Sequence, residues 1–484
     1  MNVNQTTFDA VLIGGGTAGI TAATQISHAG KSVALIERAK TGENCLYTGC
    51  VPSKSLIATA RVLHQIRNAA EFGVNVGDST LDLPRAVARK VRIGVIDARE
   101  ALERVDVVHG EARFIDPHRV AVSDRLTRGE GKVITTGSRT AAPDIPGLIE
   151  TGFVKTEELM DLTTVVRRLD FIGGGAVGLE LGHVFQRSGS RVSIIERADR
   201  LLPYDDAGIA ATEGRELERG GITFHEGAEV ARVDHDGPTK LLTIRDSAGG
   251  ERTVEADEIL VATGRPPNAE RLNVGAAGVE LDRSWIRVDK RMRTTAAHIW
   301  ACGDVTAPFV HRRRRGPGTH GCDQCPGRSR KLERSCDFMG NLYGSRAAGF
   351  SLTEAGPRSR FGGALEVLRL LYADIDRALT NGAGAGMIEV LLALGWLHGI
   401  LGSEVVGAHI AGERAGELMA HLAFQMTWRL PAGPLAKTVQ VYPTYSLGRR
   451  QAIGHHWTHA ERKSTASWTE RLQDWLSQLK PIGN

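Results

Sequence analysis

Two cysteines stand five positions apart in residues 42–54, which read GENCLYTGCVPSK. A disulfide between such close neighbours as Cys45 and Cys50, on a constrained turn, tends to be strained or exposed, and such disulfides are redox-active rather than structural. The alternative is a chance pair of buried thiols. The residues that flank Cys50 and a nucleotide-binding unit upstream favour the redox interpretation. Its reactive species is a thiolate, which nearby positive charge and a helix N-terminus stabilise.

The composition of the chain limits its class. A chain of 484 residues is too long for one hydrophobic core and indicates about three domains. The formal net charge of +4 is small for this length, so we expect neither a nucleic-acid nor a membrane partner. Six cysteines in so long a chain do not resemble a secreted disulfide framework. The short polar N-terminus leaves no room for a signal peptide, and the apolar run 388–400 falls short of a membrane span, so we expect a cytoplasmic protein.

A dinucleotide-binding pattern precedes the cysteines. A short apolar run, the glycine turn GGGTAG, a helix-compatible stretch and a second apolar run follow one another and end in Glu37. Gly14 and Gly16 allow a tight turn and the approach of backbone N–H groups to a pyrophosphate, and Gly19 lets the helix pack on the strand. Glu37 would accept hydrogen bonds from ribose hydroxyls. GxGxxG alone is weak evidence, but the flanking strands and the acid make the indication strong.

The same pattern returns later in the chain. Its glycines are Gly173, Gly175 and Gly178, and its acid is Glu196. In both copies the acid lies 23 positions after the first glycine and is followed by Arg-Ala. Two such units predict two dinucleotides, or electron transfer between them; a duplicated but empty fold is the alternative.

The cysteine segment resembles the redox-active segment of the class I pyridine nucleotide-disulfide oxidoreductases, a family of flavoproteins that includes dihydrolipoamide dehydrogenase and mercuric reductase. The resemblance extends over most of the chain, with one interruption. It implies an α/β fold with two Rossmann-like domains, for FAD and NAD, and a C-terminal α+β interface domain that forms a homodimer. It also implies that electrons pass from NAD(P)H through FAD to a Cys45–Cys50 disulfide and on to a disulfide or metal-ion acceptor. Since Glu196 would repel a 2′-phosphate, we expect NADH rather than NADPH, although the adjacent Arg197 weakens this inference.

The resemblance also assigns roles to individual residues. Cys50 is the flavin-side thiol and Cys45 the outer, interchange thiol. Lys54 and Glu180 match an ion pair near the reactive nitrogen of the flavin; without the family, each is explained as well by a surface charge. Further positions match segments that complete the two nucleotide sites, and Asp304 matches the aspartate that bonds the ribityl chain of FAD. These further cofactor-binding positions are Ala112, Thr136, Gly137, Gly264 and Asp304.

Two departures from the family concern the acceptor. Disulfide reductases of this family use a His before Pro-Thr, oriented by a Glu, as acid and base. Tyr442 stands where this His would be and Leu447 where the Glu would be. A phenol with an unperturbed pKa near 10 is a poor substitute for imidazole at neutral pH, which argues against lipoamide or glutathione reduction. Mercuric reductases also lack the His, but the cysteine pair that they carry near the C-terminus is absent here, so the acceptor stays open.

The segment 312–350 interrupts the family pattern. It is basic and then cysteine-rich, with neither helical nor strand periodicity. It is interpreted as a solvated basic loop, as a metal site built from His320, Cys322 and Cys325, or as a stretch read out of frame. We favour the frame error and predict no metal site. A protein made as written would lose a flavin-supporting helix and an interface strand, so a non-catalytic or flavin-poor product that keeps only nucleotide-binding units is the alternative function.

The remainder of the chain reads as an interface domain and a tail. Apolar alternation between residues 365 and 409 indicates strands, and 413–426 reads as a helix. Cys302 is expected to be a core residue. A helical tail is indicated by apolar spacing at Trp468, Leu472, Trp475, Leu476 and Leu479. The predicted domains are FAD-binding (1–150, with a return segment 276–311), NAD(P)-binding (151–275), aberrant (312–350), interface (351–455) and tail (456–484).

Overall fold

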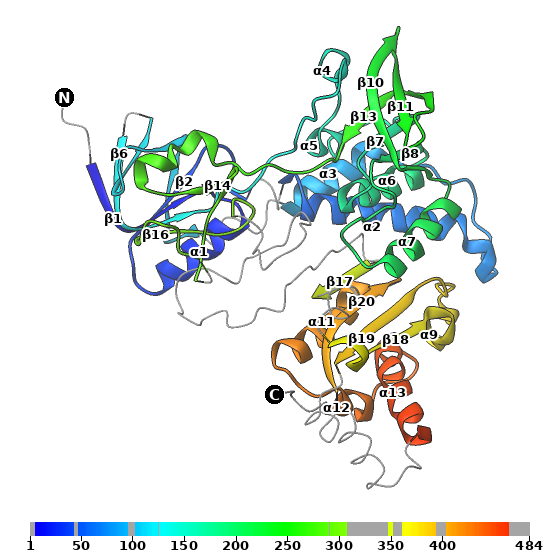
Figure 1. Cartoon of the computed structure of the whole chain (residues 1–484). Helices are drawn as coiled ribbons and strands as arrows, with labels where there is room; N and C mark the ends of the chain where they lie inside the picture. The colour runs from blue at the N-terminus through cyan, green and yellow to red at the C-terminus, as the bar shows by residue number, and fades with distance from the viewer. Residues whose placement is uncertain are drawn as a thin grey trace, which may run out of the picture. The chain divides into compact units, whose positions relative to one another are not determined.

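The computed structural model describes residues 5–42, 47–94, 102–123, 125–289, 291–306, 347–351, 361–393 and 403–463 (Figure 1). The chain divides into two compact units. The first consists of Met1–Tyr204 and Gly214–Ser335, and the second of Asp205–Glu213 and Cys336–Asn484. In the described residues, no helix is long and apolar enough to cross a membrane.

The first unit begins with a sheet in the order β3-β2-β1-β6-β5-β4, with β16 paired to β6. Strands β1, β2, β3, β6 and β16 are joined by parallel pairings, and β4 and β5 complete the sheet in antiparallel pairs. The strand–turn–helix–strand pattern predicted around the first glycine turn is confirmed as β1, α1 and β2. The strands and the helix are β1 (Gln5–Ile13), α1 (Thr17–His28), β2 (Val33–Glu37), β3 (Asp106–His109), β4 (Ala112–Phe114), β5 (Arg119–Val122), β6 (Arg125–Ile134) and β16 (Ile299–Ala301).

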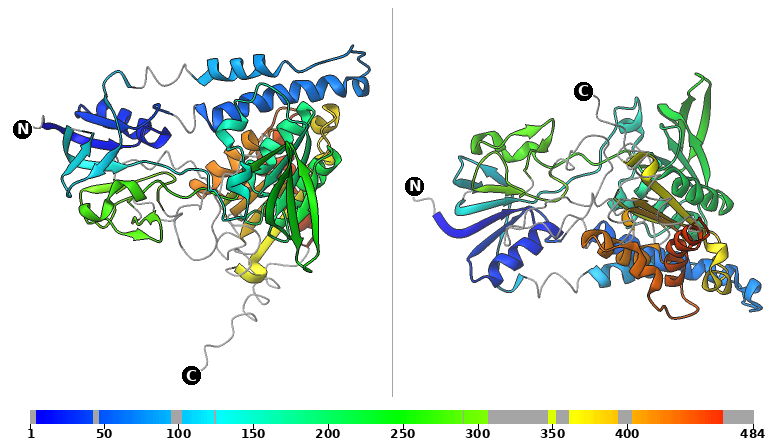
Figure 2. Two further views of the ribbon diagram at one scale, coloured as in Figure 1. Left: turned by 90° about the horizontal axis from the view of Figure 1, so that it is seen from above. Right: turned by 60° about the horizontal axis from the view of Figure 1, so that its bottom comes forward.

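The apolar runs of this sheet are buried on both faces. Every residue of β2 is buried, as expected for a parallel strand covered on both sides. Helices α2 (Cys50–Arg67) and α3 (Leu83–Gly94) pack against each other and run side by side in the left view of Figure 2. A short two-stranded sheet, β14 (Leu281–Asp282) with β15 (Trp285–Ile286), follows later in the chain.

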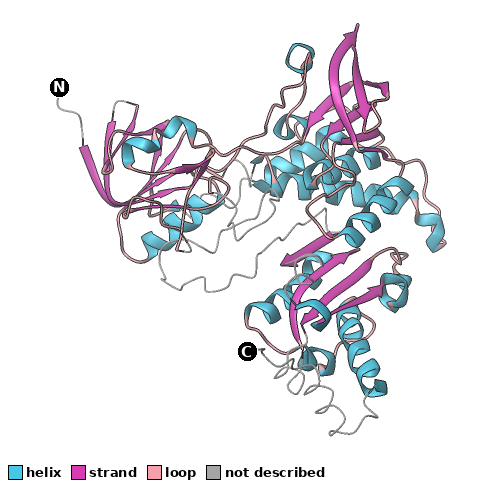
Figure 3. Cartoon of the chain, viewed as in Figure 1, coloured by secondary structure: helices cyan, strands magenta, loops and turns pink. Residues whose placement is uncertain are grey.

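The second glycine turn lies in another parallel sheet, in the order β13-β7-β8-β9. An antiparallel three-stranded sheet, β10-β11-β12, is inserted before β13, and Figure 3 shows these strands in magenta with their flanking helices in cyan. The elements are α4 (Leu148–Thr151), α5 (Thr156–Leu159), β7 (Arg168–Ile172), α6 (Ala176–Ser188), β8 (Arg191–Glu196), α7 (Ala207–Arg219), β9 (Thr223–Glu226), β10 (Ala228–Asp236), β11 (Thr239–Asp246), β12 (Glu251–Ala256) and β13 (Glu258–Val261).

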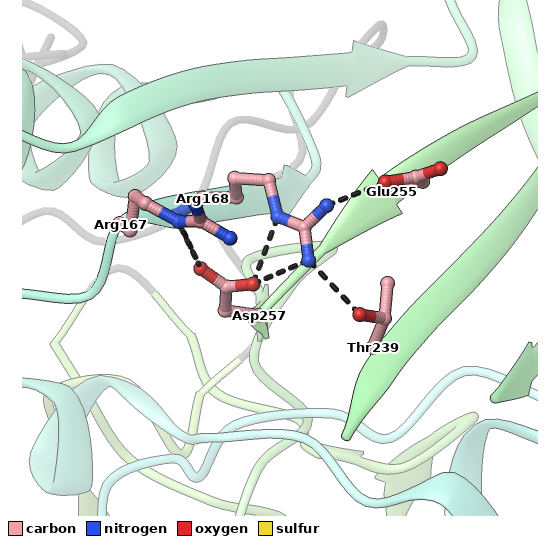
Figure 4. Close-up of polar contacts among 5 residues, drawn as sticks. All are labelled: Arg167, Arg168, Thr239, Glu255 and Asp257. Atoms are coloured by element: carbon pink, nitrogen blue, oxygen red, sulfur yellow. Dashed lines mark hydrogen bonds and ion pairs between the residues drawn. The ribbon is translucent and has the colours of Figure 1, made fainter. Parts of the chain in front are cut away.

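A polar cluster fixes the corner between these two sheets (Figure 4). The guanidinium of Arg168 donates to Asp257 Oδ1 from Nε (2.8 Å) and Nη2 (2.5 Å), to Glu255 Oε2 (2.5 Å) and to Thr239 Oγ1 (3.0 Å). Arg167 forms a longer ion pair with Asp257, at 3.6 Å. Burial alone would raise the pKa of Asp257, but its hydrogen bonds with Arg168 lower it overall. The start of β7 is thereby tied to β11 and β12.

A buried carboxyl lies on the same strand. Asp170 in β7 is 1% exposed, its Oδ2 has no hydrogen-bond partner, and burial raises its pKa to about 7. The ordinary pKa of an aspartate side chain is 3.8, so the unfolded chain releases the Asp170 proton above about pH 4. The folded protein keeps this proton up to about pH 7. This difference in bound protons makes stability fall as pH rises from about 4 to about 7.

Replacing Asp170 with asparagine removes this pH-dependent loss. We expect Asp170→Asn to be more stable than the wild type above pH 7, by about 1–3 kcal/mol, because the neutral amide of asparagine does not ionise inside the protein. The stability difference between the two proteins should grow between pH 4 and pH 7 and then stay constant. Melting temperatures of both proteins at pH 5 and pH 8 test this, and an equal difference at the two pH values contradicts it.

The second unit is built on an antiparallel sheet in the order β17-β20-β19-β18. Helices α11 and α13 pack on it, and a core of apolar side chains that includes Tyr372, Ile388 and Ile410 lies between them. Strands β18, β19 and β20 and helix α11 confirm the strands and the helix expected here, whereas residues 394–402 of the expected strand region lie outside the described residues. The elements are β17 (Ala347–Ser351), β18 (Leu365–Leu371), α9 (Asp376–Thr380), β19 (Met387–Ala393), β20 (Glu404–Ala411), α11 (Ala415–Thr427), α12 (Ala432–Lys437) and α13 (Ser446–Lys463).

Two predicted segments fall largely outside the described residues. Of the stretch 312–350, only the start of β17 is described, and this strand pairs with β20 at the edge of the sheet. The residues on which the frame-error hypothesis rests lie mostly outside the described residues, and so do the alternative metal ligands His320, Cys322 and Cys325. The tail residues 468–479 lie outside them too, whereas α13 ends at Lys463.

An arginine is buried in the second unit without a carboxylate partner in the described part of the chain. Arg449 is 1% exposed, Nη1 donates to Leu418 O at 3.2 Å, and Nε has no hydrogen-bond partner. Burial lowers the pKa of this guanidinium to about 10. Its positive charge lowers the pKa of His421, on α11.

Replacing Arg449 with methionine should stabilise the second unit. Methionine fills a similar volume without burying a charge, so we expect a gain of about 1–4 kcal/mol in the free energy of unfolding. Arg377→Met, at an exposed position of α9, is the control and should change stability by less than about 0.5 kcal/mol. Thermal and urea unfolding of both variants measure the effect. A destabilised Arg449→Met protein would show that the bond to Leu418 O outweighs the desolvation of the guanidinium.

Candidate functional site

The first glycine turn has the geometry of a dinucleotide cradle. Gly14 has a φ of +110°, and a Cβ on it would lie 2.5 Å from the carbonyl oxygen of Thr135. A Cβ on Gly19 would lie 1.9 Å from the carbonyl oxygen of Gly14. A Cβ on Gly16, by contrast, meets nothing within 4 Å, and Gly16 is the N-cap of α1, whose first turn carries no acidic residue. Open space at a helix N-terminus fits a pyrophosphate.

Glu37 is fixed at the end of β2 beside this turn. Its Oε2 accepts the backbone N–H of Gly15 at 2.6 Å, and its Oε1 accepts that of Ala39 at 2.8 Å. The residue is 9% exposed. Two backbone donors hold the carboxylate in one orientation, in which its remaining lone pairs are available to ribose hydroxyls.

The second glycine turn repeats this geometry. Gly173 has a φ of +114°, a Cβ on Gly178 would lie 2.2 Å from the carbonyl oxygen of Gly173, and a Cβ on Gly175 meets nothing within 4 Å. Glu196 accepts backbone N–H groups from the residue after Gly173 and from the second residue after itself, at 2.7 and 2.8 Å. The first turn of α6 carries no acidic residue. Both glycine turns therefore present the same features to a dinucleotide.

A pocket of about 250 Å³ lies at the first turn. Four of the predicted cofactor residues, Gly14, Glu37, Ala112 and Thr136, line it together. The predicted positions Gly16, Gly19, Gly137 and Asp304 are not among its lining residues. Beyond the predicted site residues, the polar side chains that line the pocket are Arg38, Glu111, Arg139, Asn268, Glu270 and Arg271.

Three of these residues, Asn268, Glu270 and Arg271, come from a distant segment of the chain. Thr136 Oγ1 donates to the carbonyl oxygen of Asn268 at 2.6 Å, although the two lie 132 positions apart. Arg139 and Glu270 form an ion pair at 2.9 Å. No periodicity or spacing in the sequence signals such a contact. The pocket and the open space over Gly16 fit an FAD that lies along this unit.

Asp304 and Gly264 lie on segments that return to the first sheet. Asp304 follows β16, and its Oδ2 accepts the Ser138 hydroxyl at 2.9 Å. Gly264 has a φ of +147°, and its carbonyl oxygen accepts the N–H of Ala141 at 3.0 Å. Cys302 is 1% exposed in the apolar core, as predicted.

Cys50 is the first residue of α2. No acidic residue lies in the first turn of this helix, and no side chain caps Gly49 before it. The partial positive charge of a helix N-terminus stabilises a thiolate at this position. Cys45 lies outside the described residues, so its pairing with Cys50 remains a prediction.

Lys54 and Glu180 form the predicted ion pair. The ammonium nitrogen lies 2.8 and 2.7 Å from the two carboxylate oxygens, and it joins α2 to α6. The Lys54 side chain is 42% exposed and that of Glu180 is 11% exposed. Lys54 lies one helical turn after Cys50 and adds positive charge near that thiol.

Tyr442 is exposed and hydrogen-bonded. Its hydroxyl donates to Asp376 Oδ2 at 2.9 Å, across 66 positions of sequence, and this bond raises its pKa above the ordinary value of 10. The phenol therefore stays protonated at neutral pH. This contact makes Tyr442 an even weaker replacement for imidazole as a base than its residue type alone predicts. In the described residues, no cluster of His, Cys, Asp and Glu side chains forms a metal site.

Comparison with known families identifies the class. Residues 8–324 match the family model described as pyridine nucleotide-disulphide oxidoreductase, and residues 348–453 match the dimerisation domain of the same family. The chain therefore belongs to the pyridine nucleotide-disulphide oxidoreductase family, as a class I member similar to mercuric reductase and dihydrolipoyl dehydrogenase. The predicted fold, FAD and NAD Rossmann-type domains with a dimerisation domain, is confirmed. Membership in this family implies FAD and a pyridine nucleotide as cofactors.

Proteins that are similar to this chain are named for different activities. The chain is 30% identical to mercuric reductase from Bacillus cereus, over 92% of this chain and 71% of that protein. It is 31% identical to dihydrolipoyl dehydrogenase from Thermus scotoductus, over 92% of this chain and 96% of that protein. Among solved structures, the Cu(II) complex of the HOCl-induced flavoprotein disulfide reductase RclA from Escherichia coli is similar with a TM-score of 0.77 and 26% identity, over 93% of this chain and 99% of that chain.

Proposed function

We propose that the protein is an NAD(P)H-dependent flavoprotein oxidoreductase that uses a Cys45–Cys50 disulfide to reduce a disulfide or metal-ion acceptor. The observation that supports it most is the placement of Cys50 at the N-terminus of α2, one turn before the Lys54–Glu180 ion pair. Bound FAD would supply the hydride and electron transfer that amino-acid side chains cannot carry out. Reduction of the disulfide takes two electrons and two protons and leaves two thiols.

The protein's own residues have three tasks in this proposal. The helix N-terminus and the Lys54 ammonium stabilise the Cys50 thiolate, the form in which a thiol reacts. Glu180 holds Lys54 in place beside α6. The two glycine turns, with Glu37 and Glu196, hold one dinucleotide each. We further propose that the FAD-binding domain consists of residues 1–150 and the return segment 276–311. The NAD(P)-binding domain would then span residues 151–275, and the interface domain residues 351–455.

We propose NADH as the preferred reductant. Backbone donors hold both oxygens of the Glu196 carboxylate, so this negative charge cannot turn away from the ribose position. A 2′-phosphate placed there would be repelled. Arg197 follows Glu196 and is exposed, and it offers the opposing attraction.

The acceptor is proposed as a disulfide or a metal ion. Relatives named for a metal ion and for a lipoyl substrate are similarly distant, at 30% and 31% identity. Tyr442, with its raised pKa, cannot serve near neutral pH as the base that accepts a proton from an attacking thiol and then returns it to the departing thiolate. This favours an acceptor that needs no such base, and a metal ion meets that condition.

A homodimer is proposed through the second unit. Its match to the dimerisation domain is accompanied by exposed apolar side chains on one stretch, among them Trp428 (61% exposed) and Val439 (91% exposed). Large apolar side chains that stay exposed in one subunit mark an interface, and a second copy of this chain is the partner that the domain match supports.

Replacing Trp428 with glutamate should weaken the dimer by about tenfold or more, because an aromatic side chain that the proposed interface buries is replaced by a charge. Sedimentation velocity over a range of protein concentrations measures the shift toward monomer. Ile149→Glu, at an exposed apolar position of α4, is the control and should sediment like the wild type. Unchanged dimerisation in Trp428→Glu would place the interface elsewhere.

Thiol labelling tests the proposed function. The protein is incubated with NADH without oxygen, and its thiols are then alkylated and located by mass spectrometry. We expect Cys45 and Cys50 to be labelled only after NADH, and the buried Cys302 to be unaffected in the folded protein. Equal labelling of Cys45 and Cys50 with and without NADH would remove the disulfide from the mechanism.

A further inference from the structure

The side chains of Arg265, Ser138 and Asp304 form a hydrogen-bond chain. Arg265 donates from Nε to Ser138 Oγ at 3.0 Å and from Nη2 to the Ser138 carbonyl oxygen at 2.9 Å. Ser138 Oγ lies 2.9 Å from Asp304 Oδ2 and donates to it. A guanidinium can only donate, so Ser138 Oγ accepts from Arg265 and directs its single proton to Asp304. The direction of the whole chain follows from the residue types.

The backbone fixes this chain at both ends. Three hydrogen bonds of 2.9–3.0 Å join residues 137–141 to residues 264–268, and Ser138 forms an antiparallel bridge with Pro267. Asp304 follows β16, which pairs with the end of β6. Ser138 itself is 8% exposed, so water competes little for its bonds.

The hydrogen-bond chain is adjacent to both dinucleotide sites. Thr136, two residues before Ser138, lines the pocket at the first glycine turn. Ala262, three residues before Arg265, lies against the second glycine turn, where a Cβ on Gly173 would meet its carbonyl oxygen at 2.6 Å. Arg265 thus lies where the segment leaving the second site reaches the first.

We propose that Arg265 is a positioning residue that fixes Asp304 for FAD through Ser138. The inference rests on the proposed function and on the FAD-binding role that the family resemblance assigns to Asp304. Ser138 holds Oδ2 of the carboxylate, which would leave Oδ1 to accept a hydrogen bond from bound FAD, and Arg265 fixes the hydroxyl rotation that makes the bond to Oδ2. Loss of either donor leaves Asp304 free to rotate and to bond water instead of FAD.

FAD release from the full-length holoenzyme tests the proposal. On dilution, the fluorescence of released flavin gives the FAD dissociation constant of each variant. We expect Ser138→Ala and Arg265→Met each to raise this constant about tenfold, the effect of losing one hydrogen bond to a charged group. Ser138→Thr keeps the hydroxyl and should restore binding. Arg265→Lys keeps the charge but cannot donate to both oxygens of Ser138, so it should restore binding only in part.

A double-mutant cycle separates positioning from general support of the fold. In an Asp304→Ala background, Ser138→Ala should add little to the loss of FAD affinity, because Ser138 acts through the Asp304 carboxylate. Additive losses of FAD affinity in the double variant, or an unchanged FAD dissociation constant in Ser138→Ala, would overturn the inference. FAD binding by the wild-type protein would still support the proposed function in that case. A wild-type protein that binds no FAD would overturn both together. If Ser138→Ala does not fold, the comparison of Arg265→Lys with Arg265→Met decides the question.

Discussion

Replacing Cys50 with serine should abolish the reduction of thiol or metal-ion acceptors, with a loss of at least about 10³-fold in kcat/KM. Serine cannot form a disulfide with Cys45, and its hydroxyl does not ionise near neutral pH as a thiol at a helix N-terminus does. The position of Cys50 as the first residue of α2, close to Lys54, supports this expectation. Cys45→Ser should have an equal effect on these acceptors.

Two controls make this prediction specific. Cys302→Ala changes the buried cysteine that lies outside the redox segment and should leave acceptor reduction unchanged. Direct reduction of oxygen or a quinone by the flavin should survive in Cys50→Ser, which shows that the protein is folded and holds its cofactors. Steady-state assays with NADH and each acceptor measure these rates. Substantial reduction of a thiol-type or metal acceptor by Cys50→Ser removes the cysteines from the mechanism.

Alanine at Gly19 and at Gly16 should have different effects. A Cβ on Gly19 overlaps the backbone of Gly14, so Gly19→Ala should destabilise the flavin-free protein by about 1–3 kcal/mol or more. A Cβ on Gly16 meets no atom within 4 Å, so Gly16→Ala should fold normally. It should nevertheless bind FAD at least about tenfold more weakly, because the new methyl group separates the cofactor from the backbone N–H donors.

Melting temperatures of the flavin-free proteins, together with FAD titrations, distinguish the two effects. Gly77→Ala, at an open and exposed position, is the matched control and should change neither quantity. Gly175→Ala should weaken binding of the pyridine nucleotide and leave FAD binding intact, since it occupies the equivalent position of the second turn. Full FAD affinity in Gly16→Ala would show that the pyrophosphate lies elsewhere.

Local sequence patterns predicted much of the fold. Both glycine turns stand between apolar runs and end in an acid, and each pattern forms the expected strand, helix and strand. The pairing of Lys54 with Glu180, 126 positions apart, came from the family resemblance and not from the spacing of the two residues. The short-range rules that govern helices and turns carry no information about such contacts.

The parts that the sequence did not predict depend on distant segments. Ser138 and Asp304 lie 166 positions apart, and Tyr442 and Asp376 lie 66 positions apart. Arg449 lies in a helix whose neighbours are apolar, and a single sequence gives no reason to place a cation in the core there. These contacts arise when the strands and helices are assembled, because tertiary packing determines which side chains meet.

The most direct test of the central claim is the visible absorption spectrum of the purified protein, recorded before and after NADH is added without oxygen. We predict a flavin band that gives way, on addition of NADH, to a long-wavelength band from a thiolate beside the flavin. That result would establish FAD, the use of NADH and a redox-active Cys45–Cys50 pair in one experiment. A colourless protein would contradict the account and support a product that keeps its nucleotide-binding units without a working flavin site.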